Sequence, residues 1–352
     1  MSKINMAKWS QAIIDAKDVR NLPVLYFPVL KNIEMGVIES VKDPKKMADA
    51  MVEVIREYPD TIAAITGMDL TADSEAFGAT VKFRNDQAPA VKKHILSDAD
   101  DIKALTLPDI HTGRIDVFTE AVVEAKKMVT DRPVFGGMFG PFSLAANLLE
   151  VSDALMMTIN EPDAMLELLD KCTDWLIQRA KEYKAAGANG IFVAEPTAGI
   201  LSPENLEKFS SVFVKKMVEA VQDDYFFLIL HNCGSVVNSV KSMYDTGCKG
   251  FHFGNMVNMK DVICQIPEDV LVFGNLDPSI VFTLGDPDSI REATLELLKD
   301  MESYPHFVLS SGCDLAPLVK NENMEAYYNA CREYNKAKGV ETVITLDGCL
   351  DA

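Results

Sequence analysis

Short apolar runs alternate with longer amphipathic segments along most of the chain. This alternation is typical of parallel strands joined by crossover helices, and it predicts the α/β class. Eight runs are expected to form strands, at residues 24–29, 61–66, 133–137, 190–194, 225–230, 250–253, 270–273 and 306–310. Eight such units predict a closed (β/α)8 barrel, the TIM barrel, in which functional side chains gather on the loops after the strands.

The segments between the runs carry signals for helix starts and ends. Proline favours the first position of a helix, and glycine favours the position just after its end. Two segments are expected to be additions to the barrel: residues 1–20 as a helical extension, and residues 77–83 as an extra hairpin after the second strand. The signals predict helices that begin at Pro162 and at Pro203 with Ser202 as N-cap, a helix over 288–301 opened by Asp286 and Pro287, and helix ends before Gly187 and Gly247.

Composition narrows the class of protein. No linker, low-complexity tract or repeat divides the sequence, so residues 1–352 are expected to form a single barrel domain. Acidic residues outnumber basic ones by 53 to 34, and the net charge of -19 disfavours nucleic acid and anionic membranes as partners. No apolar stretch approaches the roughly 20 residues of a membrane span, and the first residues lack a signal-peptide pattern, which predicts a cytoplasmic protein.

One histidine and two cysteines at two predicted strand ends are the best candidates for chemistry. His231 and Cys233 follow the fifth run and, two residues apart in an extended chain, are expected to point the same way. Cys313 follows the eighth run and is expected at the same rim. Three such ligands are typical of a catalytic zinc with a vacant position. A zinc ion there would deprotonate a bound thiol and prepare it to attack a methyl group.

A structural interpretation of the same residues stays open. His231 can be a hydrogen-bonded histidine of the barrel, and the two cysteines can be small buried side chains, a common use of cysteine. The seven cysteines are scattered and do not have the spacing of a disulfide scaffold. The other histidines receive no role, although His252 lies near the carboxyl end of a predicted strand; they are His94, His111, His252 and His306.

Five further polar residues follow predicted strands. Glu195, after the fourth run, is a candidate fourth ligand or acid/base group, or an ordinary carboxylate of the rim. Asn275 and Asp277, after the seventh run, are candidates for orienting a substrate or a ligand histidine, or are turn residues. Asp69 and Glu75, after the second run, are candidates for lining a cofactor pocket, or are helix caps.

Six motifs, taken together, resemble the uroporphyrinogen decarboxylase superfamily through nearly the whole chain. The resemblance is specifically to its zinc branch, the methylcobamide:coenzyme M methyltransferases and related corrinoid methyltransferases. The last three motifs are the most specific. In the order of the family, the motifs are DLTADSEAFG at 69–78, GPF at 140–142, EP at 195–196, HNCG at 231–234, GNLDP at 274–278 and SGC at 311–313.

The resemblance implies a fold, a ligand set and a reaction. The family fold is a (β/α)8 barrel, and the zinc ligands of the branch correspond to His231, Cys233 and Cys313. A methyl group would pass between the cobalt of a corrinoid and a zinc-bound thiol such as coenzyme M. Arg114 stands where the corrinoid-binding signature D-x-H-x-x-G needs glycine, so the corrinoid is expected on a separate partner protein.

The chain also departs from family patterns. Decarboxylases of the superfamily grip the carboxylates of the porphyrinogen with an arginine-rich segment, but residues 21–31 contain no arginine, which makes decarboxylation a minor possibility. Zinc-branch relatives usually carry acidic residues after the sixth strand, where this chain has FGNM at 253–256, and often Asp at the position of Glu195. Two more functions stay open: methyl transfer from a methylated substrate to a cob(I)alamin acceptor, and non-catalytic binding of a corrinoid or tetrapyrrole.

Overall fold

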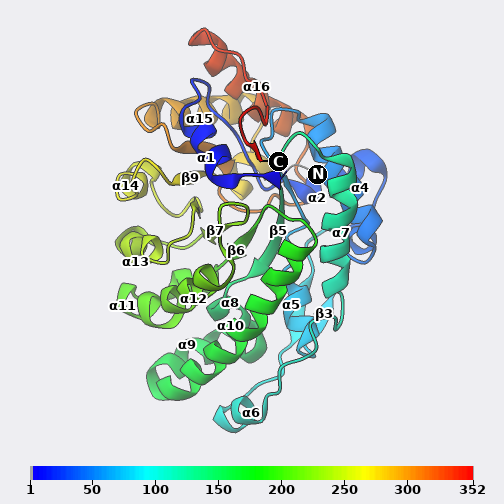
Figure 1. Cartoon of the computed structure of the whole chain (residues 1–352), viewed down its shortest axis with the longest axis vertical. Coiled ribbons are helices and arrows are strands. Elements are labelled where there is room, and N and C mark those ends of the chain that lie inside the picture. The colour runs from blue at the N-terminus through cyan, green and yellow to red at the C-terminus, as the bar shows by residue number, and fades with distance from the viewer. Residues whose placement is uncertain (1–2, 352) are drawn as a thin grey trace.

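The computed structural model describes residues 3–351 of the chain. Its centre is a curled, parallel, seven-stranded sheet in which each strand pairs with the next one along the chain (Figure 1). In chain order the strands are β2 (Ala64–Ile65), β5 (Val134–Phe139), β6 (Gly190–Ala194), β7 (Phe227–Asn232), β8 (Gly250–Phe253), β9 (Leu271–Leu276) and β10 (Phe307–Ser311).

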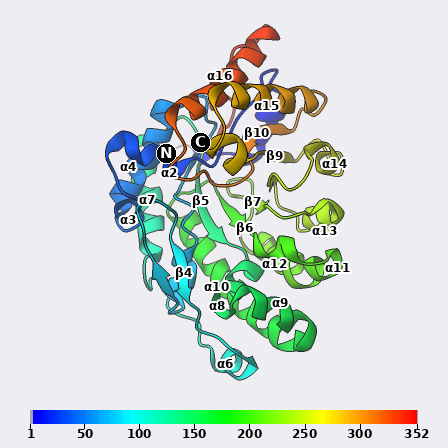
Figure 2. The ribbon, with the colours of Figure 1, turned by 180° about the vertical axis from the view of Figure 1, so that it is seen from behind.

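Helices surround the outer face of this sheet, as Figures 1 and 2 show from opposite sides. Helix α4 (Pro44–Glu57) precedes β2. The helices that lead from one strand of the sheet to the next, or follow the last, are α7 (Ile115–Met128), α10 (Pro162–Ala185), α12 (Val212–Val221), α13 (Val240–Tyr244), α14 (Met259–Ile263), α15 (Pro287–Asp300) and α16 (Asn321–Ala337). Further short helices lie in the connections: α2 (Tyr26–Val29), α3 (Val37–Ser40), α5 (Thr71–Ala76), α6 (Ala99–Ala104), α8 (Pro141–Leu149), α9 (Val151–Asn160) and α11 (Pro203–Leu206).

The predicted helix signals are confirmed. Pro162 and Pro203 occupy the first turns of α10 and α11, and the Ser202 side chain accepts a hydrogen bond from the Asn205 backbone. Asp286 caps α15 in a reciprocal pair with Ser289, which satisfies N–H groups that the first helical turn leaves free. Gly187 and Gly247 adopt positive φ angles of 93° and 82°, conformations that glycine reaches without steric cost.

The first predicted strand, residues 24–29, is wrong. Residues 26–29 form the short helix α2, and the continuous apolar run reflects burial on all sides. Such a run does not distinguish a buried strand from a buried helix. Pro28, which cannot donate to a strand ladder, lies within the first turn of α2, where a missing N–H has little effect.

The two edges of the sheet approach each other around Asn21. This residue makes single parallel bridges to Thr61, just before β2, and to Leu309 in β10. The Ile62 N–H donates to the Asn21 carbonyl at 3.1 Å, and the Leu22 N–H donates to the Leu309 carbonyl at 2.9 Å. The parallel α/β architecture is therefore observed with seven strands, whereas the closed eight-stranded barrel stays a prediction.

The structure contains a helix and a hairpin where the sequence predicts additions, and residues 1–2 of the expected extension lie outside the described residues. The N-terminal segment contains β1 (Lys3–Ile4) and helix α1 (Met6–Ile14), and β1 pairs antiparallel with β11 (Leu350–Asp351). The ring centroid of Trp9 in α1 lies 6.1 Å from that of Phe135 in β5. Both residues belong to an apolar cluster inside the curl of the sheet. The extra hairpin after β2 consists of β3 (Thr80–Lys82) and β4 (Ala90–Lys93).

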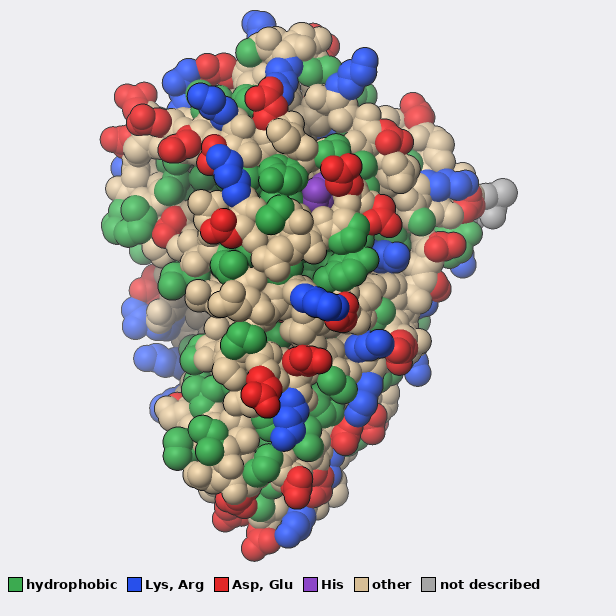
Figure 3. Space-filling model, turned by 90° about the vertical axis from the view of Figure 1, so that its left-hand side faces the viewer, with side chains coloured by type: hydrophobic (Ala, Val, Ile, Leu, Met, Phe, Trp, Pro, Cys, Tyr) green, Lys and Arg blue, Asp and Glu red, His purple; other side chains and the backbone are tan. Residues whose placement is uncertain are grey.

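Among the described residues, no single helix has both the length and the apolar composition of a membrane span. Helices α8 and α9 reach that composition only as a pair, bent by 107°. On the face shown in Figure 3, acidic and basic side chains are interspersed with hydrophobic ones. The cytoplasmic location stays a prediction.

Candidate metal centre

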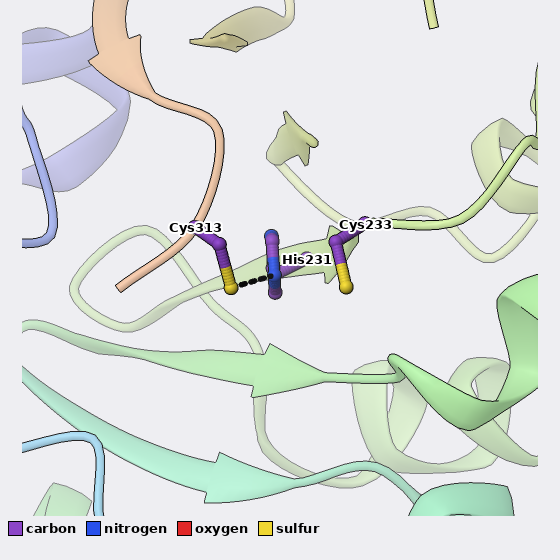
Figure 4. A group of neighbouring side chains, drawn as sticks. All are labelled: His231, Cys233 and Cys313. Carbon is purple, nitrogen blue, oxygen red and sulfur yellow. Dashed lines mark hydrogen bonds between the residues drawn. The ribbon is translucent and has the colours of Figure 1, made fainter. Parts of the chain in front are cut away.

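His231, Cys233 and Cys313 converge at the carboxyl ends of two strands (Figure 4). Their ligand atoms all lie within 4.8 Å of one another, and Cys313 Sγ is 3.6 Å from His231 Nε2. The histidine is buried, with 6% of its surface exposed, and both cysteines are half-buried. The structure therefore brings together all three residues predicted as zinc ligands.

Strand β7 sets the positions of the first two residues. It extends to Asn232, two residues beyond the predicted strand, so His231 lies within the strand and Cys233 directly after it. Between them, Asn232 points elsewhere: its amide donates to the Glu195 carbonyl at 2.9 Å and accepts from the Gly234 N–H at 2.9 Å. The alternation of an extended chain thus presents the histidine and the cysteine to the same side.

The segment after β8, residues 254–257, packs against both cysteine loops. A Cβ atom on Gly254 would lie 2.5 Å from Cα of Cys233, and one on Gly312 would lie 2.7 Å from the backbone nitrogen of Asn255. Asn275 of β9 holds this segment, because its amide donates to the carbonyls of Gly254 at 3.0 Å and Val257 at 2.8 Å. Close backbone contact at two glycines therefore positions both thiols.

The two thiols influence each other's ionisation. A hydrogen bond from the Cys313 thiol lowers the pKa of Cys233 to about 7. The same interaction, together with burial, raises the pKa of Cys313 to about 12. The pair therefore loses a first proton more easily than an isolated cysteine does, which favours metal binding because thiolates are the ligands.

The donor set and its spacing fit zinc. Tetrahedral zinc, with Zn–S of about 2.3 Å and Zn–N of about 2.0 Å, has ligand atoms about 3.5–3.8 Å apart. The observed 3.6 Å between Cys313 Sγ and His231 Nε2 matches this spacing. The remaining pairs lie within 4.8 Å, so small rotations of the thiols bring all three atoms to one ion.

His231 also contacts a second buried histidine. Its Nδ1 lies 2.7 Å from Nδ1 of His252, the residue beside it in register on β8. Nε2 of His252 lies 2.9 Å from the hydroxyl of Ser310 on β10, and that hydroxyl donates to the Leu22 carbonyl at 2.7 Å. His252 is fully buried, and burial holds its pKa well below the usual range, which keeps the ring neutral.

His252 and Ser310 are residues of the site to which sequence reasoning gave no role. The sequence does contain a signal for the histidine, because consecutive strands of a parallel sheet are neighbours and both carry histidine near their carboxyl ends. No comparable signal exists for Ser310. Its contact with His252 crosses the interior from β10 to β8, passing over the strand between them.

Glu195, directly after β6, is buried against the start of α8. Its carboxylate accepts hydrogen bonds from the Phe142 N–H at 2.9 Å, the Ser143 N–H at 2.9 Å and the Ser143 hydroxyl at 2.8 Å. Burial raises its pKa to about 7. Both oxygens are thus engaged by a helix N-terminus, and the role of Glu195 as a ligand or acid/base group stays a prediction.

Asn275 and Asp277 lie within and directly after β9. Asn275 holds the segment beside Cys233 through its two amide hydrogen bonds. Asp277 accepts from the N–H groups of Ser279 and Ile280, both at 2.7 Å, at the start of the helical turn η5 (Pro278–Thr283). Its second oxygen accepts from the Asn255 amide at 2.6 Å. These contacts position loops around the candidate centre, and a direct role toward substrate stays a prediction.

Asp69 and Glu75 share one partner, Arg114. The guanidinium contacts the Asp69 carboxylate and donates to the Glu75 carboxylate at 2.6 Å. Asp69, one residue before Leu70 at the N-cap position of α5, also accepts from the Thr71 N–H at 3.2 Å. Arg114, which in the sequence stood out only as a departure from a corrinoid signature, thus pairs with both candidate carboxylates. Their role in a cofactor pocket stays a prediction.

Comparison with known proteins identifies relatives over almost the whole chain. The family model described as uroporphyrinogen decarboxylase (URO-D) matches residues 20–334. The methylcobamide:CoM methyltransferase MtbA of Methanosarcina acetivorans is 27% identical over 326 residues, covering 90% of this chain and 94% of that protein. MtbA of Methanosarcina mazei is 28% identical over 331 residues, covering 90% and 96%. A solved methyltransferase from Methanosarcina mazei has a TM-score of 0.83 at 24% identity, covering 94% and 99%. The resemblance inferred from the motifs is confirmed.

Proposed function

Because the chain belongs to the uroporphyrinogen decarboxylase family, we propose that it is a zinc-dependent methyltransferase acting between a corrinoid and a thiol such as coenzyme M. The observation that carries this proposal is the convergence of His231, Cys233 and Cys313 within 4.8 Å at the carboxyl ends of the strands. The relatives named methylcobamide:CoM methyltransferases support the same class of reaction.

The reaction is a displacement at a methyl carbon. Zinc, when bound, lowers the pKa of a coordinated substrate thiol, so that its sulfur is nucleophilic at neutral pH. The thiol loses its proton to solvent, and a sulfur lone pair forms the new S–CH3 bond. The Co–CH3 bond of the methylated corrinoid breaks with both electrons remaining on cobalt, which goes from Co(III) to Co(I). His231, Cys233 and Cys313 would hold the zinc as three protein ligands, which would leave one position for the substrate thiol.

We propose a separate corrinoid protein as the partner. Large apolar side chains are exposed on segments that follow the carboxyl ends of β6, β8, β9 and β10. Apolar side chains that are exposed together on one face are typical of a surface that another molecule covers, and the place of these residues after the strands supports this proposal. The residues are Ile200, Met256, Ile280, Leu284 and Leu318, each at least 63% exposed.

The composition of residues 21–31 argues against decarboxylation of a polycarboxylate as the function. Lys31 is the one basic residue within 21–31, and its ammonium contacts the Val319 carbonyl. Binding several carboxylates at once requires free, preferably bidentate cations, which this segment does not supply.

The bridges of Asn21 to both sheet edges also support a closed barrel, with the candidate centre at its carboxyl-terminal mouth.

The test combines metal analysis with a half-reaction. Purified protein loaded with zinc is mixed with methylcobalamin and coenzyme M, and the loss of methylcobalamin is followed by absorbance. Wild type is expected to bind one zinc and demethylate the corrinoid, whereas Cys233→Ser and Cys313→Ser are expected to lose zinc and at least about 100-fold in rate. Cys264→Ser, at an exposed free cysteine, is the matched control.

Two results would contradict the proposal: full zinc retention in both ligand variants, or no turnover by zinc-loaded wild type with any thiol tested. Turnover only with a methylated donor and reduced cobalamin would instead assign the reverse direction of transfer. Methylated amines, thiols, alcohols and aryl ethers are the donors to test.

A further inference from the structure

His252 lies in an almost entirely apolar part of the interior. Its ring is 6.0 Å from that of Phe192 and 6.4 Å from that of Phe273, measured between centroids. Its exposed fraction is zero. A polar ring buried in this way is costly unless each nitrogen has a partner. Among the described residues, the partners are His231 on one nitrogen and Ser310 on the other.

A series of hydrogen bonds runs from His231 through His252 and Ser310 to the Leu22 carbonyl. The last acceptor determines which atom donates in each of these bonds. The Leu22 carbonyl can only accept, so the Ser310 hydroxyl donates its single proton there. The Ser310 oxygen must then accept from His252, which puts a proton on His252 Nε2. A neutral ring protonated at Nε2 has an acceptor at Nδ1. His231 Nδ1, at 2.7 Å from that acceptor, must therefore carry the proton.

This order of protons leaves the lone pair of His231 on Nε2. Nε2 is the nitrogen that faces the thiols, 3.6 Å from Cys313 Sγ. The geometry points to His252 and Ser310 as positioning residues that fix the tautomer and the ring orientation of His231 for metal binding. A ligand histidine usually donates its other N–H to an oxygen acceptor. Here the imidazole of His252 is the nearer acceptor, at 2.7 Å, and the backbone carbonyl of the same residue lies 3.3 Å away. The inference rests on the metal centre proposed above.

The chain of contacts also links the centre to the segment that bridges the sheet edges. Leu22 follows Asn21, and its own N–H donates to the Leu309 carbonyl beside Ser310. The final acceptor is therefore a backbone carbonyl fixed by strand-like pairing, which does not change rotamer. A rigid acceptor makes the tautomer of His231 a consequence of the fold.

Zinc affinity tests this role without relying on turnover. The apoproteins are titrated with zinc against a chromophoric chelator, and the cobalt(II)-loaded forms are compared by their d–d and sulfur-to-cobalt absorption bands. His252→Leu removes the ring acceptor at 2.7 Å and leaves His231 Nδ1 only the backbone carbonyl of residue 252 at 3.3 Å, so it is expected to weaken zinc binding about 10–100-fold and to shift the cobalt bands. His252→Asn keeps an oxygen acceptor near the position of Nδ1 and is expected to stay within about threefold of wild type.

Ser310→Ala and a matched histidine variant complete the set. Ser310→Ala removes the acceptor that orients His252 and is expected to weaken zinc binding by about threefold or more. His306 is also buried, at the opposite end of β10, and His306→Leu is expected to leave zinc affinity and the cobalt bands unchanged. Urea denaturation of each variant identifies those that are merely unfolded.

The outcomes separate this inference from the proposed function. If wild type binds zinc and transfers methyl groups while His252→Leu and Ser310→Ala keep wild-type zinc affinity, the positioning role is overturned and the function stands. If wild type binds no zinc, the proposed centre itself fails. Should His252→Leu not fold, Ser310→Ala decides: weakened binding with altered cobalt bands supports the role, and unchanged binding overturns it.

Discussion

Glu195 illustrates how one buried carboxylate can serve the framework of a site. Its two oxygens accept three hydrogen bonds at the N-terminus of α8. The positive end of the helix dipole and these donors favour the charged form, but burial opposes it more strongly and raises the pKa to about 7. Its backbone is tied to Asn232, between His231 and Cys233. The residue therefore connects α8 to the strand that carries two candidate ligands.

The raised pKa of Glu195 predicts a pH-dependent stability. An acid whose pKa rises from 4.5 to about 7 on folding holds its proton more tightly in the folded state. Its contribution therefore favours folding at low pH and declines as pH rises through this window, by up to about 3 kcal/mol. Glu195→Gln lacks this titration. Urea denaturation of both proteins near about pH 5 and about pH 8 measures the effect.

We expect the free energy of unfolding of wild type to fall relative to that of Glu195→Gln between the lower and the higher pH. Other carboxyl groups titrate equally in both proteins and cancel in the difference. A difference that is the same at both pH values would show that Glu195 is ionised throughout, and that the hydrogen bonds from α8 outweigh its burial.

Residue-level prediction from the sequence succeeded where a local rule applied. Period-two alternation was enough to place His231 and Cys233 on one side, and parallel strands placed Cys313 at the same rim. Partners that depend on packing across the interior were out of reach. Ser310 reaches His252 past an intervening strand, and Arg114 lies 45 positions from Asp69 in the chain.

Among the connecting elements, the segment after β8 has the most direct influence on the candidate centre. It lies between the two cysteine loops, touching Cys233 through Gly254 and approaching Gly312 through Asn255. Asn275 fixes it with two hydrogen bonds. The backbone of this segment thus packs closely against the residues that carry the candidate ligands.

This packing predicts a strong effect of one methyl group. In Gly254→Ala, the new Cβ would lie 2.5 Å from Cα of Cys233, so the backbone must move. We expect zinc affinity to fall about tenfold or more and stability to fall by about 1–3 kcal/mol. Chelator competition and urea denaturation measure the two effects.

Met256→Ala is the control, because this side chain lies on the same segment and is 64% exposed. It is expected to leave both quantities close to wild type. Wild-type zinc affinity in Gly254→Ala would mean that the segment does not position Cys233.

At the level of elements, helix boundaries were the most predictable feature. Capping residues and prolines act through contacts within one turn, so Ser202, Asp286 and Pro162 could be interpreted without the rest of the fold. The strand expected at 24–29 was wrong because an apolar run reports burial and does not specify backbone conformation. The edge contact at this place is made instead by Asn21, a polar residue outside the run.

In the molecule as a whole, packing contacts and candidate catalytic residues lie at opposite ends of the strands. At the amino ends of the strands, Trp9 packs on Phe135, and β1 pairs with β11. At the carboxyl ends lie His231, Cys233 and Cys313. The ring of Phe192 lies between the two regions, with its centroid 5.8 Å from that of Phe135 and 6.0 Å from that of His252. This division is usual in barrels of parallel strands, where function resides at the carboxyl-terminal face.

Whole-molecule architecture was predictable only in part. The recurring pattern of apolar runs was sufficient for a parallel α/β sheet with helices outside, because local periodicity determines which face is buried. How the sheet edges meet depends on single backbone contacts at Asn21, which leave no pattern in the sequence. The antiparallel pairing of β1 with β11 joins segments at opposite ends of the chain and likewise had no local signal.

X-ray absorption at the zinc edge of the metal-loaded protein tests the central claim most directly. We predict a shell of two sulfurs at about 2.3 Å and one imidazole nitrogen at about 2.0–2.1 Å, from Cys233, Cys313 and His231, with a lighter atom in the fourth position. Addition of coenzyme M should replace that atom with a third sulfur. A shell without sulfur, or one that the thiol leaves unchanged, would contradict the account.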